Sequence, residues 1–155
     1  MTNAPTSYEY DYLLYIGRFE PFHSGHLATV KEALNKSRVV IICIGSANQP
    51  RTIKNPWSAT ERSKMISSCL TQDELRRVEF CHLHDFLYNE QTWIGQVQNA
   101  VGQIVDLNET TIDGGDKPAK IGIIGYHKDD SSYYLKSFPQ WSAVEMENIN
   151  DFNST

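Results

Sequence analysis

The sequence predicts an α/β fold in which a doubly wound, Rossmann-like sheet of five parallel strands carries helices on both faces. Segments with strand character alternate with segments of helical periodicity, which is the order expected when helical crossovers join parallel strands. The run RVVIICI at residues 38–44 is apolar and β-branched without alternation, as expected of a strand that is covered on both faces. Polar loops follow the predicted strands, and ligands bind beyond the carboxyl ends of the strands in such sheets.

The individual elements are predicted from short apolar runs and from longer segments of helical periodicity. The strands are expected at residues 11–16, 38–44, 78–83, 120–124 and 143–146. The helices are expected at residues 24–36, 59–70, 90–107 and 131–137. The chain contains no internal repeats, and its 155 residues are expected to form one domain with a core of its own.

The helix signals differ from one segment to the next. In the first helix, Leu27, Val30 and Leu34 are spaced three or four residues apart. Ser58 and Glu61 form a capping box, which predicts where the second helix begins. The residues of that helix expected to face the core are Met65, Ile66, Cys69 and Leu70. The next helix is predicted by an apolar stripe of Trp93, Ile94, Val97, Val101, Ile104 and Val105.

Composition excludes several classes of protein. Fourteen basic and nineteen acidic residues give a net charge of −5 without any dense run of Lys or Arg, which argues against nucleic acid as a partner. No apolar segment approaches the ~20 residues that span a bilayer, and no signal peptide is visible, so we expect a cytoplasmic chain without a membrane partner. Cys43, Cys69 and Cys81 are expected to be small core residues in a reducing compartment. The sequence leaves open whether the chain forms a homo-oligomer.

The turn between the first strand and the first helix is the best candidate for a functional site. It has the sequence IGRFEPFHSGH, in which Gly17 allows a sharp turn or a close approach to a ligand. If the helix begins near Ser24, then His23 and His26 lie at its first turn, where free amide groups and the helix dipole attract anions. The turn therefore predicts a phosphate site. The alternative is that the two histidines merely cap the helix and that Arg18 is a solvated charge.

This turn resembles the G-x-F-x-P-x-H-x-G-H motif of the nucleotidyltransferase superfamily. Residues 45–47 (GSA) and 55–62 (NPWSATER) are similar to segments of the archaeal-type nicotinamide-nucleotide adenylyltransferases. Residues 125–141 look like the corresponding stretch of the bifunctional proteins that join this enzyme to a Nudix hydrolase. The resemblance spans residues 12–155 and implies a fold of the nucleotidyltransferase type.

The resemblance implies that the 5′-phosphate of nicotinamide mononucleotide (NMN) attacks the α-phosphorus of ATP, giving NAD and pyrophosphate without a covalent intermediate. Mg²⁺ would be held mainly by the ATP phosphates. His23 and His26 would hold the α-phosphate and the bridging oxygens, while Arg18 would bind the β- and γ-phosphates. The further residues implied on the ATP side are Gly17, Phe19, Gly125, Tyr126, Lys128, Asp129 and Ser131. The residues implied on the NMN side are Arg62, Trp93, Asp85, Asn55 and Trp57.

Three of the residues on the NMN side also have a plainer interpretation. Arg62, in the first turn of its helix, would contact the phosphate of the acceptor, or it is a surface charge. Trp93 would stack on the nicotinamide ring, or it belongs to the core. Asp85 would hydrogen-bond the acceptor or orient a partner, or it is an ordinary loop residue. His82 and His84 point to one side of their strand, and two histidines without a third ligand predict no metal site.

The sequence departs from the family at its end. The late family motif, approximately [IF]-[SN]-[AS]-T-x-x-R, supplies a further ATP-binding arginine, whereas this chain ends with FNST at residues 152–155. We therefore expect a piece of a longer protein with impaired activity. Two other functions remain open: a nucleotidyltransferase with a different phosphate acceptor, and a nucleotide-binding module without turnover.

Overall fold

The structure is a computed structural model that describes residues 8–19, 22–47, 57–85, 89–111, 119–126 and 134–146. The strands are β1 (Tyr10–Gly17), β2 (Ser37–Ile44), β3 (Val78–His82), β4 (Ile121–Tyr126) and β5 (Ser142–Met146). The helices are α1 (Ser24–Lys36), α2 (Ala59–Ser67), α3 (Gln72–Leu75) and α4 (Glu90–Thr111).

The described strands form one parallel sheet with the order β3-β2-β1-β4-β5. The chain moves outward from β1 to β3 and then returns to the other side of β1 to form β4. The strand order therefore reverses between β1 and β4, and doubly wound sheets bind their ligands beyond the carboxyl ends of the strands at such a switch point. The predicted five-stranded, doubly wound sheet is confirmed.

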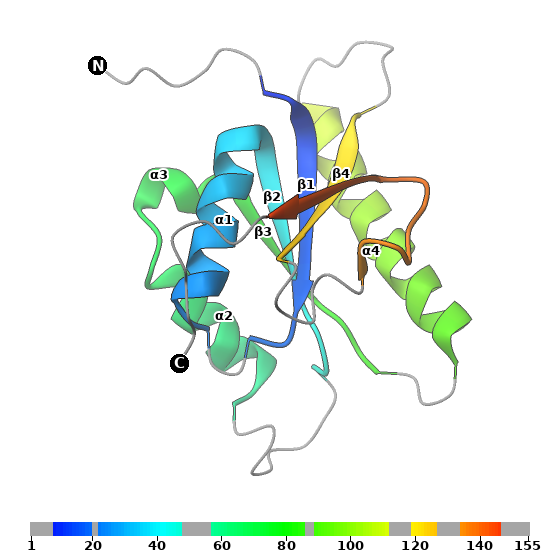
Figure 1. Ribbon diagram of the computed structural model, residues 1–155, viewed down its shortest axis with the longest axis horizontal. Coiled ribbons are helices and arrows are strands. Elements are labelled where there is room, and N and C mark those ends of the chain that lie inside the picture. The colour runs from blue at the N-terminus through cyan, green and yellow to red at the C-terminus, as the bar shows by residue number, and fades with distance from the viewer. Residues whose placement is uncertain are drawn as a thin grey trace.

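Helices cover both faces of the sheet, with α1, α2 and α3 on one face and α4 on the other (Figure 1). Along β1, Leu13 and Tyr15 pack toward α1 and α2, whereas Leu14 and Ile16 pack toward α4. This explains the unbroken apolar pattern of the central strands, because each buried aliphatic side chain contributes about 1.5–3 kcal/mol whichever face it meets. None of the helices in the described part of the chain combines the length and the apolar character that a membrane crossing needs.

The structure corrects the predicted second helix and the predicted position of Cys69. α2 ends at Ser67 rather than near residue 70, and Cys69 is exposed on the following turn instead of facing the core. Of the three cysteines, Cys43 alone is buried, and Cys81 is half-buried. The helix α3 was not predicted. Its signal was Thr71, which forms a capping box with Glu74 ahead of only four helical residues.

The other predicted bounds agree to within a few residues, with two differences worth noting. α4 continues to Thr111 rather than ending near residue 107. The predicted helix over 131–137 lies partly outside the described residues. Of its described part, Tyr134 is helical, and residues 135–137 form a turn in which the Ser137 amide donates to the Tyr134 carbonyl.

Candidate active site

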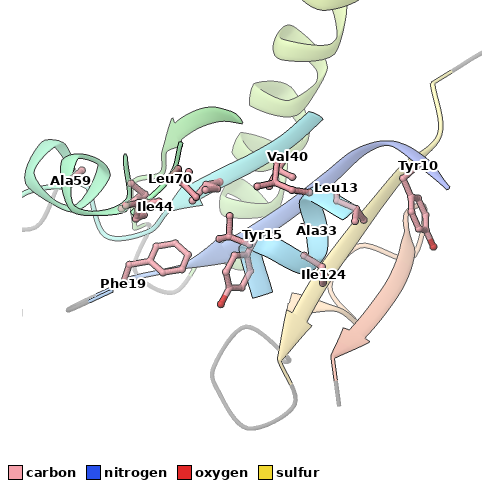
Figure 2. Close-up of a cluster of buried hydrophobic side chains, with 14 residues drawn as sticks. Tyr10, Leu13, Tyr15, Phe19, Ala33, Val40, Ile44, Ala59, Leu70 and Ile124 are labelled. Carbon is pink, nitrogen blue, oxygen red and sulfur yellow. The ribbon is translucent and has the colours of Figure 1, made fainter. Parts of the chain in front are cut away.

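β1 ends in a tight turn that places the ring of Phe19 against the strand it follows. Phe19 has a φ of 57°. Its ring meets the Tyr15 ring edge-on, with 5.2 Å between the ring centroids. The two side chains are labelled in Figure 2. A Cβ at Gly17 would lie 2.8 Å from the Phe19 ring, so a glycine is required there. The same ring meets His26 edge-on at 5.0 Å between centroids. The turn therefore links the end of β1 to the first turn of α1.

Two histidines cap the N-terminus of α1. The Nδ1 atom of His23 accepts a hydrogen bond from the Gly25 amide (3.1 Å), and the Nδ1 atom of His26 accepts one from the His23 amide (3.2 Å). The imidazoles thus fill the places that Ser or Thr and Glu or Gln usually take in a capping box. The two rings stack with 3.7 Å between centroids. A Cβ at Gly25 would lie 3.0 Å from the His23 ring, which explains the glycine between them.

These hydrogen bonds determine where the ring protons lie. An Nδ1 atom that accepts an N–H must carry its lone pair there, so the proton of each neutral ring is on Nε2. Burial, and then the neighbouring His23, lower the pKa of His26 to about 3, so this ring is neutral at pH 7. His26 therefore offers a neutral Nε2–H donor at the N-terminus of α1. Capping and anion binding are compatible, because they use different nitrogen atoms.

Arg62 is fully buried, contrary to the interpretation of a surface charge. Its Nη1 atom donates to the carbonyl oxygens of Arg18 (2.8 Å) and Gly45 (2.7 Å). Its Nη2 atom donates to the Ser46 carbonyl (3.4 Å) and its Nε atom to the Ser58 carbonyl (3.3 Å). Burial, and then the charge of Arg62, lower the pKa of His82 at the end of β3. The guanidinium group therefore lies among the carboxyl ends of three neighbouring strands.

The loop that follows β3 is bonded both to the loop after β2 and to α4. Ser46 has a φ of 55°, and its hydroxyl donates to the Asp85 carboxylate at 2.8 Å. Gln96 of α4 accepts a hydrogen bond from the His84 amide (2.8 Å) and donates to the His84 carbonyl (2.9 Å). Gln96 was not predicted, and its only signal is a polar side chain nearly two turns into the helix. The loop that carries Asp85 is thus held from both sides.

Trp93 lies at the start of α4, as predicted, and is half-buried. Its indole stacks on Tyr134, with 5.3 Å between centroids and 27° between the planes. Phe138 lies 6.0 Å from it. Tyr134 and Phe138 follow β4 in the chain, so this aromatic cluster joins the start of α4 to the segment after β4.

The remaining predicted residues divide between described and undescribed parts of the chain. Arg18 has an exposed side chain, Trp57 is half-buried just before α2, and Gly125 is buried in β4. The backbone of Tyr126 ends β4. The predicted residues that lie outside the described ranges are Asn55, Lys128, Asp129 and Ser131. Within the described ranges, no group of three or more His, Cys, Asp and Glu side chains is arranged to hold a metal ion.

Comparisons with known proteins identify a family. The model of the cytidylyltransferase-like family matches residues 14–112. A nicotinamide/nicotinic acid mononucleotide adenylyltransferase of Acinetobacter baylyi is 44% identical over 144 residues, which cover 93% of this chain and 71% of that protein. A nicotinamide-nucleotide adenylyltransferase of Ignicoccus hospitalis is 39% identical over 90 residues, which cover 57% of this chain and 52% of that protein.

A crystal structure agrees with these relatives. It is that of a bifunctional NMN adenylyltransferase/ADP ribose pyrophosphatase of Francisella tularensis, complexed with AMP and a manganese ion. It superposes with a TM-score of 0.76 at 36% identity, and the match covers 93% of this chain but only 39% of the Francisella chain. The resemblance seen in the sequence is confirmed: the chain belongs to the cytidylyltransferase-like family of nucleotidyltransferase enzymes, among the NMN adenylyltransferases.

Proposed function

We propose that the chain transfers the AMP group of ATP to NMN, giving NAD and pyrophosphate. An oxygen of the NMN 5′-phosphate attacks the α-phosphorus, the bond from that phosphorus to the bridging oxygen breaks, and pyrophosphate leaves with the electron pair. The observation that carries this proposal is the stacked pair of His23 and His26 at the N-terminus of α1, beside the switch point of the sheet. The cysteines are free thiols, which suits a reducing compartment, so we place the reaction in the cytoplasm.

On the ATP side, the histidine pair supplies hydrogen-bond donors rather than acids or bases. The Nε2–H groups of His23 and His26 donate to the α-phosphate and its bridging oxygen, and they bind more tightly as negative charge develops there. The planar guanidinium of Arg18 suits the β- and γ-phosphates. The residues proposed to complete the ATP site are Gly17, Phe19, Gly125, Tyr126, Lys128, Asp129 and Ser131.

On the NMN side, we assign the nicotinamide ring to Trp93. A half-buried indole attracts a positively charged ring through its π face. Asp85, whose carboxylate accepts the Ser46 hydroxyl, hydrogen-bonds the acceptor. Asn55 and Trp57 complete this side.

A divalent metal enters this reaction as part of the ATP substrate. The manganese ion in the Francisella structure supports the use of such a metal. The histidine pair presents N–H donors, which do not ligate metals, so the phosphate oxygens supply the ligands, as is common for Mg²⁺. When it is bound, Mg²⁺ neutralises charge on the leaving pyrophosphate.

The proposal is tested by supplying ATP and Mg²⁺ with NMN, nicotinic acid mononucleotide or nicotinamide riboside. We expect NAD and pyrophosphate in equal amounts with NMN, and neither product with the riboside, which lacks the attacking phosphate. Pyrophosphate release with an unrelated phosphate acceptor but not with NMN would assign a different acceptor. Tight ATP binding without pyrophosphate from any acceptor would identify a binding module instead.

A further inference from the structure

The position of Arg62 suggests a role other than binding the acceptor's phosphate. We propose that Arg62 is a positioning residue that holds the carboxyl ends of β1 and β2 together and, through Ser46, places Asp85. This inference rests on the proposed function, because the two sites it positions are those for ATP and NMN.

The donor geometry of Arg62 is the first support. A guanidinium group has five N–H donors, and four of those of Arg62 are used by the backbone carbonyls of Arg18, Gly45, Ser46 and Ser58. The side chain is fully buried. A phosphate ligand needs N–H groups that reach an open surface, whereas these point into the protein.

The strand ends that Arg62 joins are the second support. The Gly45 amide donates to the Gly17 carbonyl at 2.8 Å. The Arg62 guanidinium donates to the carbonyls of Arg18, the first residue after β1, and Gly45, the first residue after β2. The backbone at Arg18 therefore has a fixed position relative to β2. Since Arg18 is proposed to bind the β- and γ-phosphates, a shift of this carbonyl would move the ATP site.

The third support is the continuation toward the acceptor. Ser46 accepts from Arg62 through its carbonyl and donates through its hydroxyl to Asp85. Its φ of 55° lies in the left-handed region, which a serine adopts at a cost unless its neighbours hold it there. Arg62 thus supports the conformation that directs the Ser46 hydroxyl to Asp85.

Arg77 provides a matched control. Arg77 is half-buried, where Arg62 is fully buried, and its guanidinium group also bonds backbone carbonyls, those of Ser37 (2.8 Å) and Arg38 (3.1 Å) among them. These residues lie at the start of β2, at the opposite edge of the sheet from the site. Lysine cannot reproduce the planar fork of arginine, so both R62K and R77K are expected to lose stability.

The experiment compares R62K and R77K by thermal unfolding, by steady-state kinetics and by calorimetric titration with ATP, NMN and nicotinamide riboside. We expect both variants to unfold at a lower temperature. Well below that temperature, R62K should lower kcat at least tenfold, weaken ATP binding at least fivefold, and weaken NMN and riboside binding by equal factors. R77K should leave all of these within twofold of the unsubstituted chain.

The alternatives give different results. If R62K weakens NMN alone, with ATP and the riboside unaffected, Arg62 is a phosphate ligand and the proposal is wrong. If R62K changes stability only, as R77K does, its role is merely structural and the proposal is also wrong. If the unsubstituted chain makes no NAD but R62K still weakens ATP where R77K does not, the positioning role is supported and the proposed reaction fails.

Should R62K not fold, S46A tests the second half of the inference. This change removes the hydroxyl contact to Asp85 and leaves the carbonyls that Arg62 bonds in place. We expect weaker binding of NMN and of the riboside by the same factor, at least threefold, with unchanged ATP binding. Unchanged binding of all three would contradict the link from Arg62 through Ser46 to Asp85.

Discussion

Replacing His26 with asparagine separates its capping role from its proposed role as a donor. The Oδ1 atom of asparagine can still accept the His23 amide, as Nδ1 does now at 3.2 Å, but the Nε2–H donor is lost. Removing one donor to a transition-state oxyanion typically costs about 3 kcal/mol, so kcat should fall roughly a hundredfold. The lost ring contacts with His23 and Phe19 cost about 1 kcal/mol each. For a chain of this size, 1 kcal/mol corresponds to about 2–4 °C in Tm.

NAD formation at saturating ATP and NMN, together with calorimetric unfolding, measures both effects. His26→Ala is the comparison, because it removes the donor and also the cap, which is worth about 1 kcal/mol. Both variants should therefore lose the same activity, while the alanine variant loses more stability. A kcat of His26→Asn within threefold of the unsubstituted chain would refute the assignment of the Nε2–H group to the transition state.

Three other predictions follow from the same geometry. Because the pKa of His26 is lowered to about 3 from an ordinary 6.5, the unfolded chain binds the extra proton between those values. The free energy of unfolding measured in urea should therefore be constant above pH 6.5 and fall by up to ~1.4 kcal/mol per pH unit below it. If the free energy of unfolding of His26→Asn falls equally steeply below pH 6.5, the lowered pKa of His26 is contradicted. Gly25→Ala should retain Tm within a few degrees but lower kcat at least tenfold, since its Cβ displaces the His23 ring. An unchanged kcat would contradict the proposed role of His23 as a donor. Trp93→Ala should raise the KM for NMN at least tenfold and leave the KM for ATP unchanged, and equal changes in both would assign the indole to the core.

The sheet and the main helices were predictable because their signals are local. The apolar run at 38–44 is buried only if helices cover both faces of its strand. The strand and helix signals around residues 17–26 place the histidines at a helix N-terminus. The sequence pattern is compatible with helix capping by the two imidazoles as well as with phosphate binding. What spacing does not show is that Nδ1 caps while Nε2 stays available.

The role of Arg62 was not predictable, because its partners are backbone carbonyls far away in sequence. A hydrophilic residue in the first turn of a helix is usually exposed. No sequence pattern distinguishes such a residue from one whose side chain bonds the carboxyl ends of β1 and β2. Gln96 was missed for the same reason. Cys69 was misplaced because α2 ends one turn early, which turns the expected core position toward solvent.

The most direct test of the account is the ¹⁵N spectrum of the histidine rings as ATP is added. The structure predicts that His26 carries its proton on Nε2 and does not titrate between about pH 5 and pH 8, and that the Nε2–H signals of His23 and His26 shift when ATP binds. Titration of His26 near its ordinary pKa, a His26 proton on Nδ1, or Nε2–H signals that do not shift when ATP is added would contradict the proposed role of the histidine pair.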